Sequence, residues 1–196
     1  MGKLLNSICN SICIACTTPY QLMGAISLVQ GLKLEADLYL FGMFPDYDVI
    51  AGRLGKYGIF RRVVPVDCSR FRFLSLTKAL WQMMNSRKTV SFFLAQGECY
   101  DEMYTSSRAH VKLLMRKELE HRNPRMKFVI FEDGLGTYSA KSHVLVSSRL
   151  RRIVEKVFRW DSFAPDRTTL MATHPELVER PKKLEGVPVR KMPTLN

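Results

Sequence analysis

The sequence alternates between short apolar runs and longer segments in which apolar residues recur at helical spacing. A continuous apolar run suits a strand that is buried on both faces, and a helical segment between two such runs suits a crossover connection. The alternation therefore predicts β-α repeats and a mostly parallel sheet. The expected strands are residues 11–16, 36–42, 61–66, 89–95, 125–131 and 168–173, and the expected helices are residues 18–32, 45–57, 74–84, 106–121 and 149–160.

The fold class that follows is α/β, with a Rossmann-like sheet. A chain of 196 residues, 46% of them apolar, is long enough to bury one core. We expect residues 1–172 to form one domain. From residue 173 the sequence is rich in proline and charge, so we interpret residues 173–196 as the start of a connection to a second domain that the chain lacks.

The net charge of +12 favours anionic partners such as nucleotides, acidic glycans, anionic lipids or nucleic acids. Five cysteines, an odd number, do not match a secreted disulfide framework. No apolar run is long enough for a membrane helix, and polar residues interrupt the first apolar segment, which disfavours a signal peptide. We therefore predict a cytoplasmic protein.

Cys9, Cys13 and Cys16 have the spacing C-x3-C-x2-C, with which radical enzymes that use S-adenosylmethionine hold an iron-sulfur cluster. The apolar residues around Cys13 and Cys16 favour instead a buried strand, in which alternate side chains point to opposite faces. The two side chains would then diverge. We interpret these residues as buried strand cysteines, and the cluster is the alternative.

Asp46 and Asp48 form the Asp-x-Asp spacing with which some glycosyltransferases bind a divalent metal and a nucleotide sugar. The same residues suit a helix start, where Asp46 would cap the helix and Asp48 would face the positive end of its dipole. We predict no metal site. Thr18 and Gln21 similarly predict a capping box, with Pro19 at the first helical position.

The segment 129–139, "VIFEDGLGTYS", places two carboxylates directly after an apolar strand. In open parallel sheets, ligands bind beyond the carboxyl ends of the strands, so Glu132 and Asp133 would reach a binding crevice. Gly134 and Gly136 permit close approach of a ligand to the backbone. The alternative is that Asp133 and Gly134 form an ordinary turn.

Two blocks, "CTTPYQLMGAISL" and "FVIFEDGLGTYS", resemble those of the bacterial sialyltransferases of glycosyltransferase family 52, the lipooligosaccharide sialyltransferases, and of the related capsular polysialyltransferases. The resemblance implies the N-terminal, acceptor-side half of a GT-B enzyme. Such enzymes are inverting and independent of metal. They transfer sialic acid from CMP-sialic acid, the donor substrate, to a glycan hydroxyl of surface lipooligosaccharide or capsule, and need no cofactor.

The resemblance also assigns roles to residues. Asp133 would be the general base, and Glu132 would orient the acceptor or tune that base. His174, followed by Pro175, would contact the nucleotide phosphate. The remaining candidates for substrate binding are Thr17, Thr18, Gln21, Gly134, Gly136 and Thr137.

The expected partners are CMP-sialic acid and a glycan acceptor, with a second copy of the chain as a further candidate. The predicted helix 149–160 has a basic flank, which is either a solvated face or a contact with anionic lipid at the inner face of the bacterial membrane. A catalytically inactive remnant that binds only glycan or lipid is the alternative function. A nucleic-acid-binding module is disfavoured, because the aromatic residues fall mainly within predicted strands and are not interleaved with basic residues.

Overall fold

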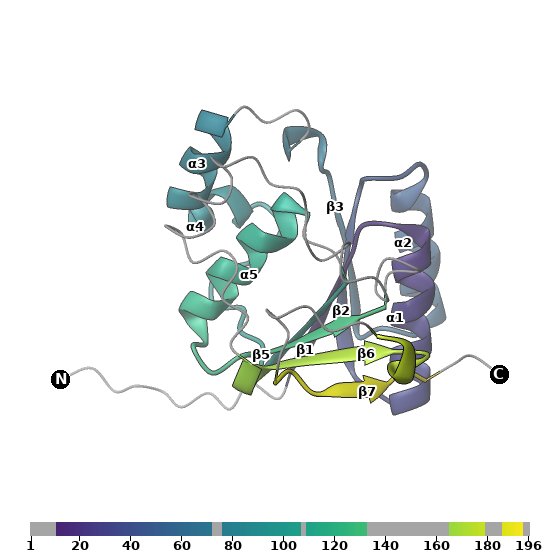
Figure 1. The fold of residues 1–196 in the computed structure, drawn as a ribbon. Coiled ribbons are helices and arrows are strands. Elements are labelled where there is room, and N and C mark those ends of the chain that lie inside the picture. Colours follow the sequence, from purple (N-terminus) through teal and green to yellow (C-terminus); the bar gives the residue numbers. More distant parts are fainter. Residues whose placement is uncertain (1–10, 72–75, 107–108, 133–164, 179–185, 194–196) are drawn as a thin grey trace.

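The computed structural model of the chain describes residues 11–71, 76–106, 109–132, 165–178 and 186–193. In this part of the chain, seven parallel strands form one sheet in the order β3-β2-β1-β4-β5-β6-β7 (Figure 1). The α/β, Rossmann-like fold predicted from the sequence is confirmed. The strands are β1 Ile12–Cys16, β2 Ala36–Phe41, β3 Arg62–Val66, β4 Glu102–Thr105, β5 Lys127–Phe131, β6 Thr168–Ala172 and β7 Val189–Lys191.

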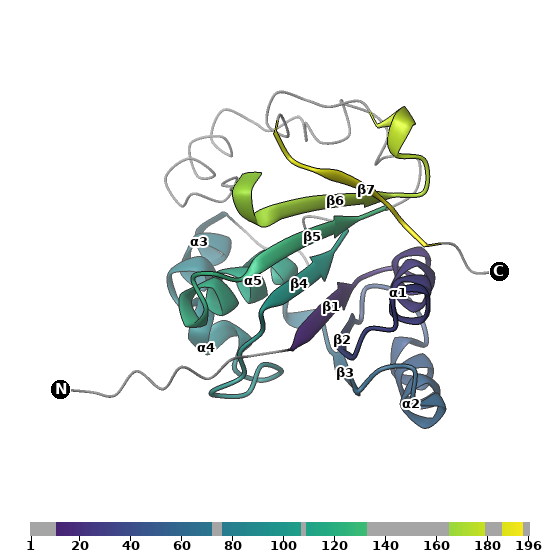
Figure 2. The same ribbon diagram turned by 90° about the horizontal axis from the view of Figure 1, so that it is seen from below.

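Helices cover both faces of the sheet (Figures 1 and 2). On one face lie α1 Pro19–Leu32 and α2 Tyr47–Tyr57, and on the other lie α3 Leu76–Met84, α4 Ser86–Val90 and α5 His110–Arg122. Three short 3-10 helices complete the described elements: η1 Ser69–Phe71, η3 Pro165–Arg167 and η4 Pro175–Leu177.

The core is divided by the sheet, as the alternation of side chains along β1 shows. Cys13 and Ala15 pack in the cluster that contains the buried residues of α5. Ile14 and Cys16 pack in the cluster that contains the buried residues of α1 and α2. The prediction that Cys13 and Cys16 diverge is therefore confirmed, while Cys9 lies outside the described residues.

The strand order reverses direction at β1. From β1 the chain adds β2 and β3 on one side of the sheet, and β4 to β7 extend it on the other. The carboxyl ends of β1 and β4 therefore border the topological switch point, beside which open α/β sheets bind their ligands. Helices α1 and α5 start at this edge.

The start of α1 agrees with the predicted capping box in one half only. Thr18 is the N-cap, and its side-chain oxygen accepts a hydrogen bond of 3.2 Å from the Gln21 amide, with Pro19 next in the chain. The Gln21 side chain does not return to the Thr18 amide as a capping box requires. Its Oε1 accepts from the amide of Thr17 at 2.8 Å, one residue earlier.

The strand predicted over residues 89–95 is wrong. This segment contains the end of α4 followed by a turn. Val90, Phe93 and Leu94 are buried while Phe92 is 42% exposed, a pattern of i, i+3, i+4 that fits helical geometry and not alternation. The strand in this position of the sheet is β4, whose four residues carry only two apolar side chains between Glu102 and Thr105.

The last strand, β7, was not predicted and falls within the range 173–196 that we interpreted as a connection. It pairs in parallel with β6, where Leu170 is opposite Val189. The chain that follows β7 lies close against α1. A β-carbon added at Gly31 would overlap Pro193, so this position depends on the absence of a side chain, while one at Gly24 would lie 3.0 Å from the flexible end of Met192.

Three further observations bear on the sequence predictions. Asp46 is the N-cap residue of α2 with a left-handed backbone, φ 55°, and its side chain makes no capping hydrogen bond; Asp48 lies in the first turn. Among the described residues, no group of three or more His, Cys, Asp or Glu side chains is arranged to hold a metal ion. No helix in the described ranges has the length and apolar character needed to cross a membrane.

Candidate functional site

The carboxyl edge of the sheet has a buried polar cluster where β1 meets α1. The Gln21 side-chain oxygen accepts hydrogen bonds from the Thr17 amide at 2.8 Å, the Thr17 hydroxyl at 2.9 Å and the Lys112 ammonium at 3.2 Å. The ammonium also donates to the carbonyl of Ala15 at 3.4 Å. Lys112 is 1% exposed and comes from α5, so the cluster joins helices that cover opposite faces of the sheet.

Glu132 lies at the same edge, directly after β5, and is 7% exposed. Its Oε2 accepts a hydrogen bond of 2.7 Å from the Thr173 amide, which follows β6. Its Oε1 accepts a hydrogen bond of 3.1 Å from the Tyr20 hydroxyl in the first turn of α1. One carboxylate therefore fixes the ends of two neighbouring strands and the start of α1 relative to one another.

A pocket of about 180 Å³ opens beside Glu132. Tyr20 and Met23 line it and are 53% and 54% exposed, so an aromatic ring and a thioether face solvent next to a carboxylate. Carboxylate oxygens accept hydrogen bonds from hydroxyl groups, and an aromatic ring offers a flat apolar surface. The lining residues are Tyr20, Met23, Gly24, Ser27, Glu132, Thr173, Met192 and Pro193.

Ser106 follows β4 at the topological switch point. Its hydroxyl oxygen is the one buried side-chain nitrogen or oxygen atom in the described ranges that has no hydrogen-bond partner. A buried hydroxyl without a partner is unfavourable, and in native proteins a bound water or ligand commonly supplies the missing bond.

His110, the first residue of α5, is close to this edge. Its Nε2 lies 3.0 Å from the side-chain oxygen of Gln82. Burial lowers the pKa of His110 to about 4. The imidazole is therefore neutral near neutral pH and acts there as a hydrogen-bonding group without charge.

The sequence-predicted residues that the structure describes meet at one edge. Thr17 and the N-cap Thr18 precede α1, Gln21 lies in its first turn, and the Glu132 carboxylate accepts a hydrogen bond from Tyr20 of that helix. His174 follows Thr173 at the end of β6, and its exposed ring lies 3.2 Å from Glu176 Oε1. The other candidates, Asp133, Gly134, Gly136 and Thr137, lie outside the described residues, as does the predicted helix 149–160.

Sequence reasoning missed four residues of this edge: Tyr20, Ser106, Lys112 and Thr173. Tyr20 lies inside the block "CTTPYQLMGAISL", between residues that the sequence analysis did name as candidates for substrate binding, so its position in the sequence could have identified it. Lys112 belongs to a helix with many charged residues, and nothing in its local sequence marks it as the lysine that is buried. Thr173 acts through its backbone amide, which no side-chain pattern reveals.

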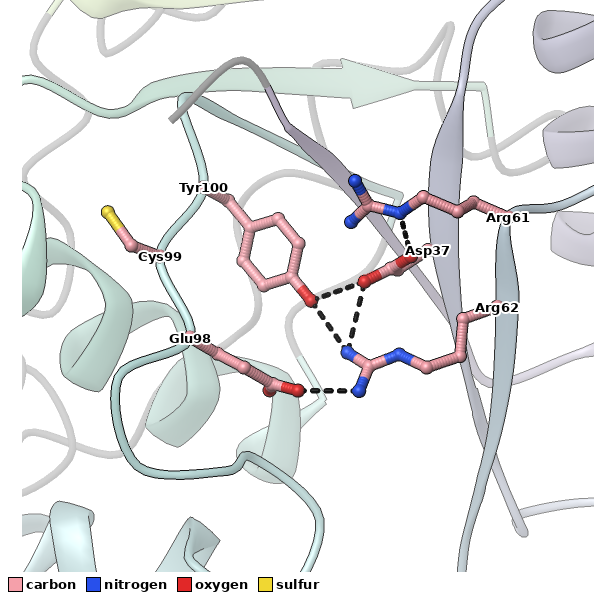
Figure 3. A pocket seen from close by; sticks show the side chains of 6 residues that line it. All are labelled: Asp37, Arg61, Arg62, Glu98, Cys99 and Tyr100. Carbon is pink, nitrogen blue, oxygen red and sulfur yellow. Dashed lines mark hydrogen bonds and ion pairs between the residues drawn. The ribbon is translucent and has the colours of Figure 1, made fainter. Parts of the chain in front are cut away.

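The opposite, amino edge of the sheet has a larger pocket, of about 480 Å³, with a charged network that the sequence did not predict (Figure 3). Asp37, the second residue of β2, accepts hydrogen bonds from Arg61 Nε at 2.8 Å, Arg62 Nη2 at 3.0 Å and the Tyr100 hydroxyl at 2.8 Å. Arg62 also forms an ion pair of 2.6 Å with Glu98. The two acids and two arginines balance in charge.

The pKa values of this network follow from its geometry. Burial by itself raises the pKa of Asp37, but the hydrogen bonds from Arg61 and Tyr100 and the two guanidinium charges outweigh burial, and the pKa falls below its ordinary value of 3.8. Burial raises the pKa of Tyr39 and of Tyr100, whose hydroxyls lie 2.9 Å apart. Asp37 is therefore ionised and both phenols are neutral at neutral pH. The arrangement is that of a closed structural network.

No protein-family model matches this chain, and a search of curated proteins finds no match either. The resemblance to sialyltransferases therefore depends on the two sequence blocks.

Proposed function

We propose that this chain is the acceptor-side part of a GT-B glycosyltransferase that resembles inverting, metal-independent sialyltransferases. The observation that carries the proposal is the hydrogen bond between Tyr20 and Glu132. These residues belong to the two blocks on which the resemblance depends, they are 112 positions apart in the sequence, and they meet at the carboxyl edge of the sheet. That edge is where folds of this class bind their ligands.

In the proposed reaction, a hydroxyl of the glycan acceptor attacks the anomeric carbon of CMP-sialic acid. The carboxylate of Asp133, which follows Glu132 in the sequence, takes the hydroxyl proton. A new bond forms between the acceptor oxygen and the anomeric carbon, and the bond from that carbon to the phosphate oxygen of CMP breaks. Attack opposite to the departing CMP inverts the configuration at the anomeric carbon.

The described residues support a positioning role for Glu132. Both of its oxygens accept hydrogen bonds from groups of the protein, and it is nearly buried. A carboxylate held in this way fixes the backbone that leads to Asp133 and adds negative charge beside it. Like charge nearby raises the pKa of a carboxyl group and makes it a stronger base.

We propose that the pocket of about 180 Å³ receives a sugar ring of the acceptor. The apolar face of a sugar ring packs well on an aromatic ring such as that of Tyr20, while Ser27 and Glu132 offer polar atoms for its hydroxyls. His174, one residue after Thr173 at the same edge, is the proposed contact for the nucleotide phosphate. The proposed location is the cytoplasm, and association with a second copy remains a prediction.

The test combines turnover with binding. We expect a version of the protein completed with its downstream donor-binding domain, incubated with CMP-sialic acid and galactose-terminated acceptors, to release CMP, and Asp133→Asn to lower the rate by about 100-fold or more. Tyr20→Ala should weaken acceptor binding, followed by ligand-detected NMR, whereas the exposed Glu35→Gln control should change neither readout. Unchanged CMP release in Asp133→Asn would contradict the assignment.

The second candidate is a domain that binds glycan without turnover. The observation that favours it is the pocket beside Tyr20, because binding a sugar there requires no catalytic group. The same experiment separates the two. Acceptor binding that depends on Tyr20, with no CMP release from any acceptor by the version that includes the donor-binding domain, would support the binding domain and exclude the transferase.

A further inference from the structure

Helices α3 and α4 carry apolar and basic side chains that are exposed to solvent. Trp81 and Met84 are 58% and 73% exposed. Lys78, one turn before Trp81, and Arg87 and Lys88 of α4 are exposed as well. We call these five residues the α3–α4 face. Figure 1 shows α3 and α4 together with α5 on the face of the sheet opposite to α1 and α2.

The charge of this region has one sign. Residues 68–97 include five Lys or Arg and no Asp or Glu. The exposed face of α2, on the other side of the sheet, differs because it combines Arg53 and Lys56 with Asp48. The α3–α4 face is thus a locally cationic surface from which a tryptophan and a methionine project.

We propose that the α3–α4 face docks on an anionic lipid surface. Tryptophan favours the boundary between water and lipid, since its ring is apolar while its N–H retains a polar partner. Lys and Arg beside it are attracted to acidic headgroups. Exposed apolar side chains with a basic flank on a surface helix are the combination that peripheral binding uses. The proposal concerns a surface contact only and does not depend on the catalytic assignment.

A vesicle assay with the full chain tests the proposal. The vesicles contain phosphatidylcholine with about one third phosphatidylglycerol, and pure phosphatidylcholine vesicles are the reference. We expect binding to the anionic vesicles to fall at least about tenfold in Arg87→Glu/Lys88→Glu. Arg53→Glu/Lys56→Glu is the matched control, because it makes the same change in net charge on the opposite side of the sheet, and it should retain most of the binding.

The apolar contribution has its own matched pair. Trp81→Ala should weaken binding by several-fold, whereas Tyr57→Ala, which removes a side chain that is 77% exposed on α2, should not. In a Trp160→Phe background, the remaining Trp81 fluorescence should shift to shorter wavelength when anionic vesicles are added. Urea denaturation of each variant verifies folding, and the milder Arg87→Gln/Lys88→Gln replaces any variant that does not fold.

Four results would overturn the proposal. Equal loss in the two double charge reversals would show nonspecific attraction of a basic protein. Loss only in Lys156→Glu/Arg159→Glu would place the contact in the sequence-predicted helix 149–160. Self-association that Trp81→Ala abolishes, without vesicle binding, would identify a second copy as the occupant. If Arg87→Glu/Lys88→Glu weakened binding to duplex DNA more than binding to vesicles, the ligand of this face would be nucleic acid.

Discussion

The two edges of the sheet both hold buried charged groups, but they use them differently. At the amino edge, Asp37 is paired with Arg61 and Arg62, and the acids and bases of that network balance one another (Figure 3). At the carboxyl edge, Glu132 accepts hydrogen bonds from the backbone amide of Thr173 and the phenol of Tyr20. The Ser106 hydroxyl at that edge has no hydrogen-bond partner within the part of the chain that the structure describes.

The difference indicates that Asp37 at the amino edge is structural and that the carboxyl edge, with Glu132, is better suited to a ligand. A carboxylate neutralised by two guanidinium groups has little remaining attraction for a ligand, and its loss leaves buried partners without a counter-charge. The donors to Glu132 at the carboxyl edge, a backbone amide and a phenol, are neutral and do not cancel its charge. The larger pocket thus lies beside Asp37 at the amino edge, and the smaller pocket lies beside Glu132 at the carboxyl edge, to which we assign the proposed function.

The largest effect should come from Asp37→Asn at the amino edge. Removing the charge leaves Arg61 and Arg62 facing Tyr100 without their shared acid, and we expect the free energy of unfolding to fall by about 3 kcal/mol. This is the low end for a broken buried pair, because both arginines are roughly half exposed and can be hydrated. Urea denaturation measures the change. Glu35→Gln, an exposed acid that precedes β2, should stay within about 0.5 kcal/mol of the parent. A loss for Asp37→Asn no larger than this control would show that the network is not structural.

As the pH falls, the protein should lose stability first at His110, near the carboxyl edge, and later at Asp37, at the amino edge. The pKa of His110 is about 4 in the folded protein against an ordinary 6.5, so the unfolded chain binds more protons between these values. Stability from the neutral His110 is therefore complete above about pH 6.5 and is lost as the pH falls towards 4, at a cost of about 1–2 kcal/mol near pH 5. The pKa of Asp37 lies below 3.8, so the stability it provides is complete above that value and is lost only as the pH falls through the lowered pKa.

Urea midpoints near pH 7 and near pH 5 test this order. His110→Gln should remove most of the decrease between the two pH values, whereas His121→Gln, an exposed histidine on the same helix, should not. If His110→Gln and the parent lose equal stability, the titrating group lies elsewhere.

The smallest effect should come from Glu132→Gln at the carboxyl edge. The glutamine oxygen can still accept one of the two bonds from Thr173 and Tyr20, so about 1 kcal/mol of unfolding free energy should be lost. Glu176→Gln, an exposed acid on η4, is the control and should have almost no effect. A loss as large as that of Asp37→Asn would contradict the distinction between the edges.

The sequence predicted much of the fold because buried parallel strands and their crossover helices have strong local patterns. It placed β1, β2, β3, β5 and β6, and it located Thr17 and Glu132 directly after strands and Gln21 in the first turn of α1. It failed at residues 89–95, where apolar side chains spaced for a helix also formed a continuous apolar run. It missed β4 and β7 because strands of four and three residues carry too little pattern to be recognised.

The sequence by itself determined the parallel α/β architecture, the capped start of α1 and the position of an acidic residue after β5. Only the tertiary structure decided which charged residues are partners: Lys112 with Gln21, Asp37 with Arg61 and Arg62, and Glu132 with Tyr20. The physical reason is range. Periodicity and capping act between residues a few positions apart, whereas Tyr20 and Glu132 are separated by 112 positions and meet only when β1 and β5 take their places in one sheet.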